Sequence, residues 1–230
     1  MGVGPGDPEL LTLAAVQAIE QADVVATPVA REGRASRAAT IASRHIAPQQ
    51  RLLSLLFPMV AAAAPRQQAW HRAADAVAAE VSAGRSVVLL CEGDASLFAS
   101  CSYALLALAD RHPSVPVAVV PGITAAAAAA AAAAAQGLPW PLALQQEGLL
   151  IRPTPETPAE LEALLDWAQA QQAVLALLKL GRRWRWVQPL LERRGLLCSS
   201  LFAQRVGGPI SSWPARRRSR PMSSLTFHSC

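Results

Sequence analysis

The residues best suited to ligand chemistry lie in three short glycine-containing loops. The loops comprise residues 2–7 (GVGPGD), 92–94 (EGD) and 121–124 (PGIT). The second and third follow apolar segments that favour a β-strand, and the first begins in a very short strand remnant. Glycine allows a backbone to turn sharply or to approach a ligand closely. Because ligands of open parallel sheets bind beyond the carboxyl ends of the strands, we predict that the three loops contribute to one site.

Taken singly, each loop also has a simpler structural explanation. Asp94 could only cap the helix that follows it, and Thr124 could only cap the alanine-rich helix after the third loop. The first loop does not fit the dinucleotide fingerprint GxGxxG, because the third glycine is missing and no suitable acidic residue follows the second strand. The three loops in this order are more specific than any one of them.

The apolar pattern predicts an α/β chain in which strands and helices alternate. Strands are expected at residues 24–27, 52–57, 87–91, 115–120, 149–151, 174–178 and 201–206, after a short strand remnant at residues 1–3. Helices are expected at residues 9–22, from beyond 37 to about 46, at 66–83, after residue 94, and at 124–135, 158–171 and 184–194. This order is typical of two open, largely parallel sheets, and we predict α/β domains at residues 1–121 and 122–230.

Composition narrows the function without fixing it. The net charge of +5 makes an acidic partner plausible, either nucleic acid, phosphate or a small polycarboxylate, although an ordinary basic surface would look the same. The four cysteines and four histidines form no metal-ligand string, so we expect no metal site. The start of the chain does not resemble a secretory signal, and glycine and proline interrupt the uncharged segment at residues 113–146. We therefore expect a cytoplasmic protein without a membrane span.

Four strings in the chain resemble the successive signatures of the tetrapyrrole methylase superfamily. They are GVGPGDPELLT (2–12), CEGD followed by SLFAS (91–100), VPGIT (120–124) and LLKLG (177–181), and together they span nearly the whole chain. Within the superfamily, residues 91–108, 141–155 and 177–197 resemble precorrin-2 C(20)-methyltransferases, especially those of cyanobacterial type.

The resemblance implies two open α/β domains of the tetrapyrrole methylase kind, unlike Rossmann methyltransferases, with the active site in a cleft between them. It further implies that S-adenosylmethionine is the cofactor and that the protein is a homodimer. By motif position, the residues expected to line the cofactor pocket are Pro5, Gly93, Asp94, Leu97 and Thr124, with Ala125 and Leu178 as further candidates.

The expected acceptor is precorrin-2 or its cobalt complex, a tetrapyrrole with carboxylate side arms. The fork-shaped guanidinium of arginine suits carboxylates, and we predict that Arg31, Arg34 and Arg37 bind them. A solvated surface loop is the alternative for these arginines. The sequence identifies no catalytic residue, and Asp7 and Asp94 are only speculative bases.

Three other functions remain open from the sequence. The chain could methylate uroporphyrinogen III or RNA as another member of the superfamily, or it could be an inactive relative with a short N-terminus and an altered tail. It could also be an RNA-binding module that uses the basic cluster at residues 216–220. We expect no nucleic-acid partner, because the sequence lacks the interleaved aromatic residues of base-stacking surfaces.

Overall fold

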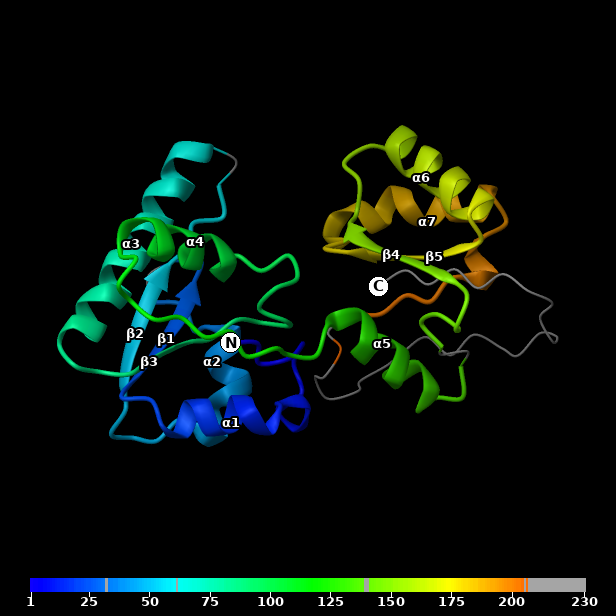
Figure 1. Cartoon of the computed structure of the whole chain (residues 1–230). Helices are drawn as coiled ribbons and strands as arrows, with labels where there is room; N and C mark the ends of the chain where they lie inside the picture. Colours follow the sequence, from blue (N-terminus) through cyan, green and yellow to red (C-terminus); the bar gives the residue numbers. More distant parts are fainter. Residues whose placement is uncertain (32, 61, 139–140, 205, 207–230) are drawn as a thin grey trace. The chain divides into compact units, whose positions relative to one another are not determined.

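The computed structural model describes residues 1–206 except 32, 61, 139, 140 and 205. The chain divides into two compact units, Met1–Thr124 and Ala125–Cys230, and each contains helices and parallel strands (Figure 1). The predicted α/β class is therefore confirmed. The basic cluster at residues 216–220 and the tail from Gly207 lie outside the described residues. No helix among the described residues combines the length and apolar character needed to cross a membrane.

The first unit is built on a parallel sheet with the strand order β2-β1-β3. Its strands are β1 (Val24–Val29), β2 (Arg51–Leu56) and β3 (Val87–Leu89). Its helices are α1 (Leu13–Glu20), α2 (Arg37–Ala42), α3 (Ala63–Ser82) and α4 (Cys101–Arg111), with short 3-10 helices at Pro8–Leu10 and Ser43–His45. The central strand pairs with both neighbours, since Val24 lies opposite Arg51 on one side and Val87 on the other.

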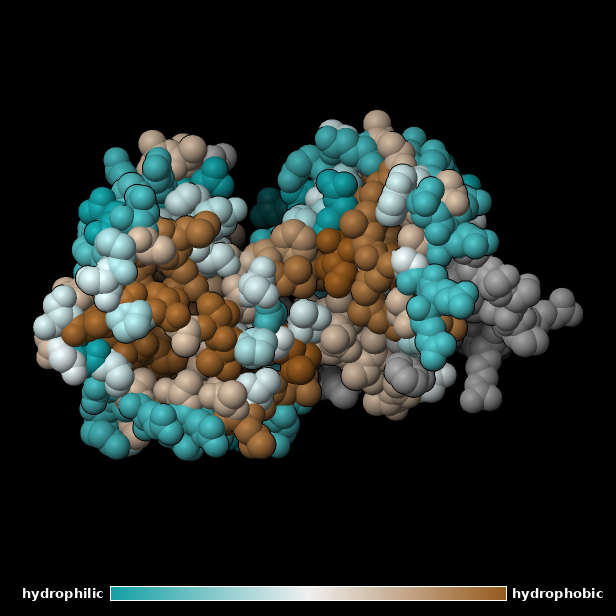
Figure 2. All heavy atoms as spheres, viewed as in Figure 1, coloured by the Kyte–Doolittle hydropathy of each residue, from teal (hydrophilic) through white to brown (hydrophobic). Residues whose placement is uncertain are grey.

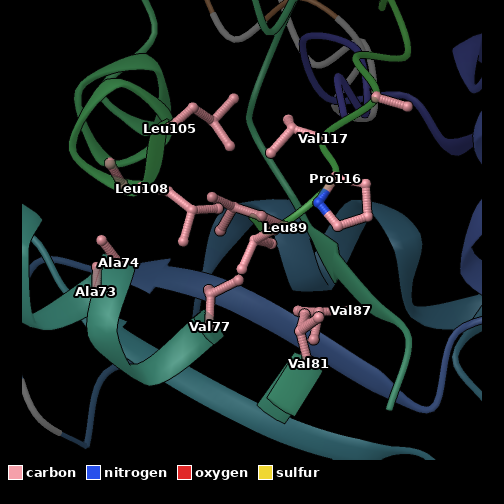
Figure 3. A pocket seen from close by; sticks show the side chains of 13 residues that line it. Ala73, Ala74, Val77, Val81, Val87, Leu89, Leu105, Leu108, Pro116 and Val117 are labelled. Carbon is pink, nitrogen blue, oxygen red and sulfur yellow. The ribbon is translucent and has the colours of Figure 1, made fainter. Parts of the chain in front are cut away.

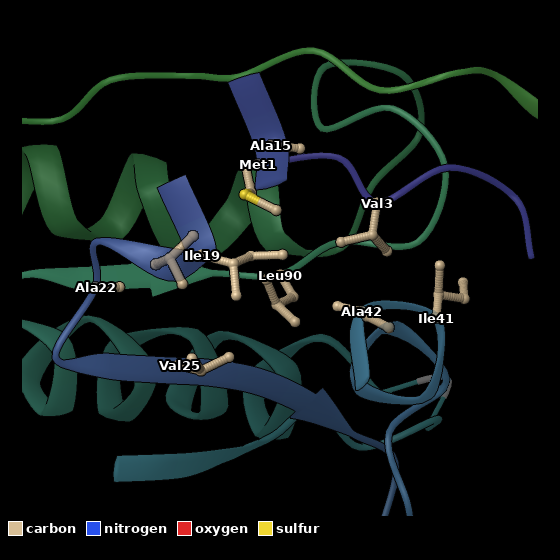
Figure 4. Close-up of a cluster of buried hydrophobic side chains, with 11 residues drawn as sticks. Met1, Val3, Ala15, Ile19, Ala22, Val25, Ile41, Ala42 and Leu90 are labelled. Carbon is tan, nitrogen blue, oxygen red and sulfur yellow. The ribbon is translucent and has the colours of Figure 1, made fainter. Parts of the chain in front are cut away.

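Alternate residues of the central strand enter two different cores, as expected for a strand covered on both faces. Val25 packs with Ile19 of α1 and Ile41 of α2, and Figure 4 shows these side chains gathered with Leu90. Its neighbour Ala26 belongs to the other cluster, which contains residues of α3 and α4. Helices therefore cover both faces of this sheet.

The second unit contains the parallel pair β4 (Gly148–Pro153) and β5 (Ala173–Leu178). Its helices are α5 (Ala125–Ala134), α6 (Pro158–Ala170) and α7 (Trp184–Arg193), with short 3-10 helices at Gly181–Arg183 and Leu197–Ser199. A capping box starts α6, because the Thr157 hydroxyl accepts from the Glu160 N–H and the Glu160 carboxylate accepts from the Thr157 N–H. Leu161 and Leu190 are fully buried where α6 and α7 pack on the strands.

Two predicted strands are not formed. Residues 115–120 have the β-branched composition of a strand, but Pro116 has no N–H to donate to a β-ladder. The contact of this segment with the first loop is a hydrogen bond from the Gly2 N–H to the Val120 carbonyl. A mainly apolar cavity of about 100 Å³ lies between this segment, β3, α3 and α4 (Figure 3). Residues 201–204 also form no strand; instead Phe202 stacks on Trp184.

Because residues 115–120 form no strand, some of their apolar side chains lie at the surface of the first unit. Val117 and Val119 are 47% and 55% exposed. Figure 2 shows apolar residues at the surface of this unit beside the polar side chains of its helices. The start of the first loop does pair with another segment, because Gly2 forms an isolated parallel bridge with Cys91 just beyond β3.

Candidate functional site

The structure brings the three glycine-containing loops into direct backbone contact within the first unit. Gly4 and Gly93 exchange two hydrogen bonds, from the Gly4 N–H to the Gly93 oxygen at 3.1 Å and from the Gly93 N–H to the Gly4 oxygen at 2.8 Å. The Gly2 N–H donates to the carbonyl of Val120 at 2.9 Å, which joins the first loop to the residue just before the third. The three loops therefore form one junction at the carboxyl end of β3.

Gly2 and Gly122 are required by the closeness of the backbones at this junction. A Cβ atom at Gly2 would lie 2.5 Å from the carbonyl oxygen of Gly93 and 2.8 Å from the Cα of Gly122. A Cβ atom at Gly122 would in turn lie 2.8 Å from the Cα of Gly2. Neither position can carry a side chain unless the backbone moves.

Gly93 has a different environment on its open side. Its φ angle is +76°, a left-handed conformation that glycine adopts readily, and no heavy atom lies within 4 Å of the place where its Cβ would be. A ligand could approach the backbone there without meeting a side chain of the protein. Gly93 is thus the part of the junction where the backbone lies open.

Asp94 ties the second loop to the third and is almost fully buried. One carboxylate oxygen accepts hydrogen bonds from the Ser96 N–H at 2.8 Å and from the Ser96 hydroxyl, and the other accepts from the Gly122 N–H at 2.8 Å. Burial opposes ionisation of the carboxyl, but the hydrogen bonds from Ser96 and Gly122 outweigh it and hold its pKa below the ordinary value. Asp94 is therefore an ionised link between loops.

The other predicted cofactor residues lie in both units. Pro5 is buried in the first loop, Leu97 is half-buried after the second, and Thr124 is half-buried at the end of the third. Ala125 is the first residue of α5, and Leu178 is the last residue of β5, so both belong to the second unit. The Leu178 carbonyl accepts hydrogen bonds from the backbone N–H and the hydroxyl of Thr154.

The three predicted substrate arginines are all exposed. Arg31 and Arg34 lie in the loop after β1, where the Arg34 N–H donates to the Arg31 carbonyl at 3.3 Å. Arg37, the first residue of α2, forms an ion pair with Glu92 at 3.1 Å. Sequence reasoning missed this role of Glu92, because nothing local links residues so far apart in the chain.

Two buried cysteines flank the second loop. Cys91 and Cys101 are free thiols that pack with Ala95 and Ala99. A hydrogen bond with Cys101, together with burial, raises the pKa of the Cys91 thiol. Among the residues that the structure describes, no group of three or more histidine, cysteine or acidic side chains is arranged to hold a metal ion.

Comparisons with known proteins identify the family of the chain. The model of the tetrapyrrole (corrin/porphyrin) methylases matches residues 1–209. A precorrin-2 C(20)-methyltransferase from Sinorhizobium sp is 34% identical, with 89% of this chain and 82% of the relative covered. A cobalt-precorrin-2 C(20)-methyltransferase from Salmonella typhimurium is 30% identical, with 89% and 81% covered.

A solved structure supports the fold independently. The cobalt precorrin-4 methyltransferase superposes with a TM-score of 0.58 at 24% identity, covering 85% of this chain and 73% of that one. The family match covers every residue that the structure describes, including all three loops of the junction. The chain belongs to the tetrapyrrole (corrin/porphyrin) methylases.

Proposed function

We propose that the chain is an S-adenosylmethionine-dependent methyltransferase that methylates C-20 of precorrin-2, or of cobalt-precorrin-2, in cobalamin biosynthesis. The observation that carries this proposal is the likeness over 89% of the chain to two enzymes that are both named for methylation at this carbon. The product from precorrin-2 is precorrin-3A. The junction of three glycine-containing loops is the proposed cofactor site.

The residues of the junction fit an adenosyl cofactor. The open side of Gly93 leaves room for a ligand against the backbone. Pro5 lies on the first loop and Leu97 shortly after the second, and the hydrogen bonds between Gly4 and Gly93 hold these two loops together. When bound, S-adenosylmethionine supplies an already activated methyl group on a sulfonium. The protein therefore needs mainly to hold cofactor and acceptor in line, a contribution worth roughly 7–11 kcal/mol in well-oriented systems.

Thr124, Ala125 and Leu178 complete the proposed cofactor pocket. Thr124 ends the loop that Gly122 and Asp94 fix in place, and Ala125 follows it directly. Leu178 ends a strand of the second unit, where a ligand of an open parallel sheet is expected. We propose that the two units are separate domains that meet near residue 121 in sequence.

Asp94 is poorly suited to act as a base. Both of its oxygens accept hydrogen bonds from the protein, and its pKa is lowered, so its affinity for a proton is reduced. Asp7 accepts a hydrogen bond from the Glu9 N–H at the start of the Pro8–Leu10 turn. We therefore assign no general base. We propose that the protein accelerates the reaction mainly by aligning the cofactor with the acceptor.

Arg31, Arg34 and Arg37 are the proposed contacts for the carboxylates of the acceptor. They are exposed and lie in the loop after β1 and at the start of α2, next to the second glycine loop through the Arg37–Glu92 pair. Guanidinium groups can bind carboxylates through two parallel hydrogen bonds. The net charge of +5 also favours an acidic acceptor.

The experiment that tests this function compares acceptors directly. Purified protein with methyl-labelled S-adenosylmethionine and no added metal is given precorrin-2, cobalt-precorrin-2, uroporphyrinogen III or RNA in separate reactions. The proposal expects label in one or both of the first two acceptors and little in the others. Preferential labelling of uroporphyrinogen III or RNA would contradict the acceptor while leaving the family unchanged.

We further propose that the enzyme is a cytoplasmic homodimer. This assembly follows from the family resemblance and from the small residues of α5, which allow close packing against a neighbouring surface. Sedimentation equilibrium at micromolar concentration should give twice the chain mass of 24.2 kDa. A fully active monomer under the same conditions would exclude the dimer as the working form.

A further inference from the structure

We propose that Glu92 is a positioning residue that holds Arg37 in place for a carboxylate side arm of the acceptor. The inference rests on the proposed function, because it concerns how the acceptor is bound. It gives Glu92 a role that differs from those of its neighbours Gly93 and Asp94, which form and support the cofactor junction.

The elements on both sides of the pair are fixed by the fold. Arg37 begins α2 after the buried helix cap Ser36, and Thr40 donates its hydroxyl to the Ser36 carbonyl at 3.1 Å. Glu92 precedes Gly93, whose backbone exchanges two hydrogen bonds with Gly4. The ion pair therefore connects two anchored segments and restricts the direction of the Arg37 guanidinium.

The pair lies at the edge of the sheet where the proposed site is built. β1 leads to the arginine loop, and β3 leads to the second glycine loop. The two strands are parallel and adjacent, with Ala26 opposite Leu89, so both loops leave the sheet at the same edge. Carboxyl ends of neighbouring parallel strands are where ligands of such sheets bind. Arg37 is thus well placed to contact a ligand of the cofactor junction.

Arg37 keeps most of its hydrogen-bonding capacity in this arrangement. A guanidinium has five N–H donors, and the contact with Glu92 uses the Nη2 nitrogen at 3.1 Å. The Arg37 side chain is 60% exposed and the Glu92 side chain 46%, so the pair is accessible to a ligand. Ion pairs with this exposure add little stability, and the main effect of Glu92 is therefore geometric.

Arg31 and Arg34 provide a contrast within the same segment. Neither forms an ion pair with any residue in the described part of the chain, whereas Arg37 is oriented by a carboxylate from another loop. Restricting a long side chain before binding reduces the entropy lost when the ligand arrives. We therefore assign Arg37 the most specific contact of the three.

A double-mutant cycle on the full-length enzyme tests the role of Glu92. Methyl transfer to precorrin-2 is measured for wild type, Arg37→Ala, Glu92→Ala and the double variant. We expect Arg37→Ala to raise the acceptor KM by about tenfold and Glu92→Ala by about threefold, with kcat and the cofactor KM within about twofold of wild type. The double variant should be no worse than Arg37→Ala, because Glu92 acts only through Arg37.

Two further variants separate positioning from a merely structural role. Glu92→Gln keeps an oxygen that can accept from the guanidinium and should recover most of the acceptor KM. Arg111→Ala removes the exposed ion pair with Asp75, which joins α4 to α3, and should leave both KM values unchanged. Circular dichroism of each variant checks that it is folded.

The outcomes distinguish this inference from the proposed function. An active wild type with an unchanged acceptor KM in Glu92→Ala, additive effects in the double variant, or a loss confined to cofactor affinity would each overturn the positioning role. A folded wild type that transfers no methyl group to precorrin-2 or its cobalt complex would instead contradict the proposed function.

Discussion

The carboxylate of Asp94 accepts a hydrogen bond of 2.8 Å from the backbone N–H of Gly122, 28 residues further along the chain. The same carboxylate binds Ser96 through its other oxygen. Asp94 therefore supports the junction from inside the protein, and its contribution to cofactor binding is expected to be indirect.

Replacing Asp94 by Asn should weaken cofactor binding almost as much as replacing it by Ala. Both carboxylate oxygens accept hydrogen bonds, whereas an amide would present an NH₂ group to Ser96 or to Gly122. Each charged hydrogen bond lost is worth about 1.5–3 kcal/mol, so calorimetry should show at least about a tenfold loss of affinity for S-adenosylhomocysteine. A folded Asp94→Asn variant with wild-type affinity would show that the link does not support the site.

The free energy of unfolding should depend on pH through the ionisation of Asp94. Because the pKa of Asp94 is lower in the folded protein, its ionised form stabilises the fold at all pH values above the ordinary Asp pKa of about 3.9. This contribution disappears as the pH falls through the folded pKa. The difference in unfolding free energy between wild type and Asp94→Asn should be constant from about pH 5 upward and shrink below about pH 4. Urea unfolding across this range measures it, and a difference that grows on acidification would contradict the assignment.

Gly93→Val should abolish cofactor binding in a protein that still folds. The side chain would enter the open space beside the junction, and the φ angle of +76° adds backbone strain. Gly84 provides a matched control, because it has a φ of +78°, equally open surroundings and a position at the end of α3. Gly84→Val should lose stability without losing affinity for S-adenosylhomocysteine. Equal affinity in wild type and Gly93→Val would exclude the proposed position of the cofactor.

Gly122→Ala should destabilise the first unit itself. Its Cβ would lie 2.8 Å from the Cα of Gly2 and closer still to the Gly93 carbonyl oxygen, and both obstacles are backbone atoms that cannot rotate away. Overpacking of this kind typically costs about 1–3 kcal/mol. Thermal unfolding should show the loss, and an unchanged midpoint would mean that the three backbones are less closely packed than the structure describes.

The sequence predicted those features that depend on local pattern. The strand beginning at Val87 and the helix α3, which ends just before Gly84, follow from apolar runs and glycine position, and both are formed. The second and third loops could be recognised because their glycines stand at the ends of apolar segments, and the first because its glycines are closely spaced around Pro5. Features of this kind require only neighbouring residues.

The remaining features depend on contacts between distant parts of the chain. The bonds from Asp94 to Gly122 and from Arg37 to Glu92 join segments that come together only when the sheet forms, so local sequence pattern could predict neither bond. The strand expected at residues 115–120 failed for a related reason. Its β-branched residues favour a strand, but Pro116 has no N–H to donate to a β-ladder. The segment instead bonds to Gly2 of the first loop through the carbonyl of Val120.

The most direct test of the account is the position of the transferred methyl group. Purified enzyme is incubated with precorrin-2 and S-adenosylmethionine carrying a ¹³C-labelled methyl group, and the product is examined by NMR. The account predicts a single labelled methyl group per tetrapyrrole, attached to C-20 at the bridge between rings A and D. Label at any other carbon of the macrocycle, in a protein that binds the cofactor normally, would contradict it.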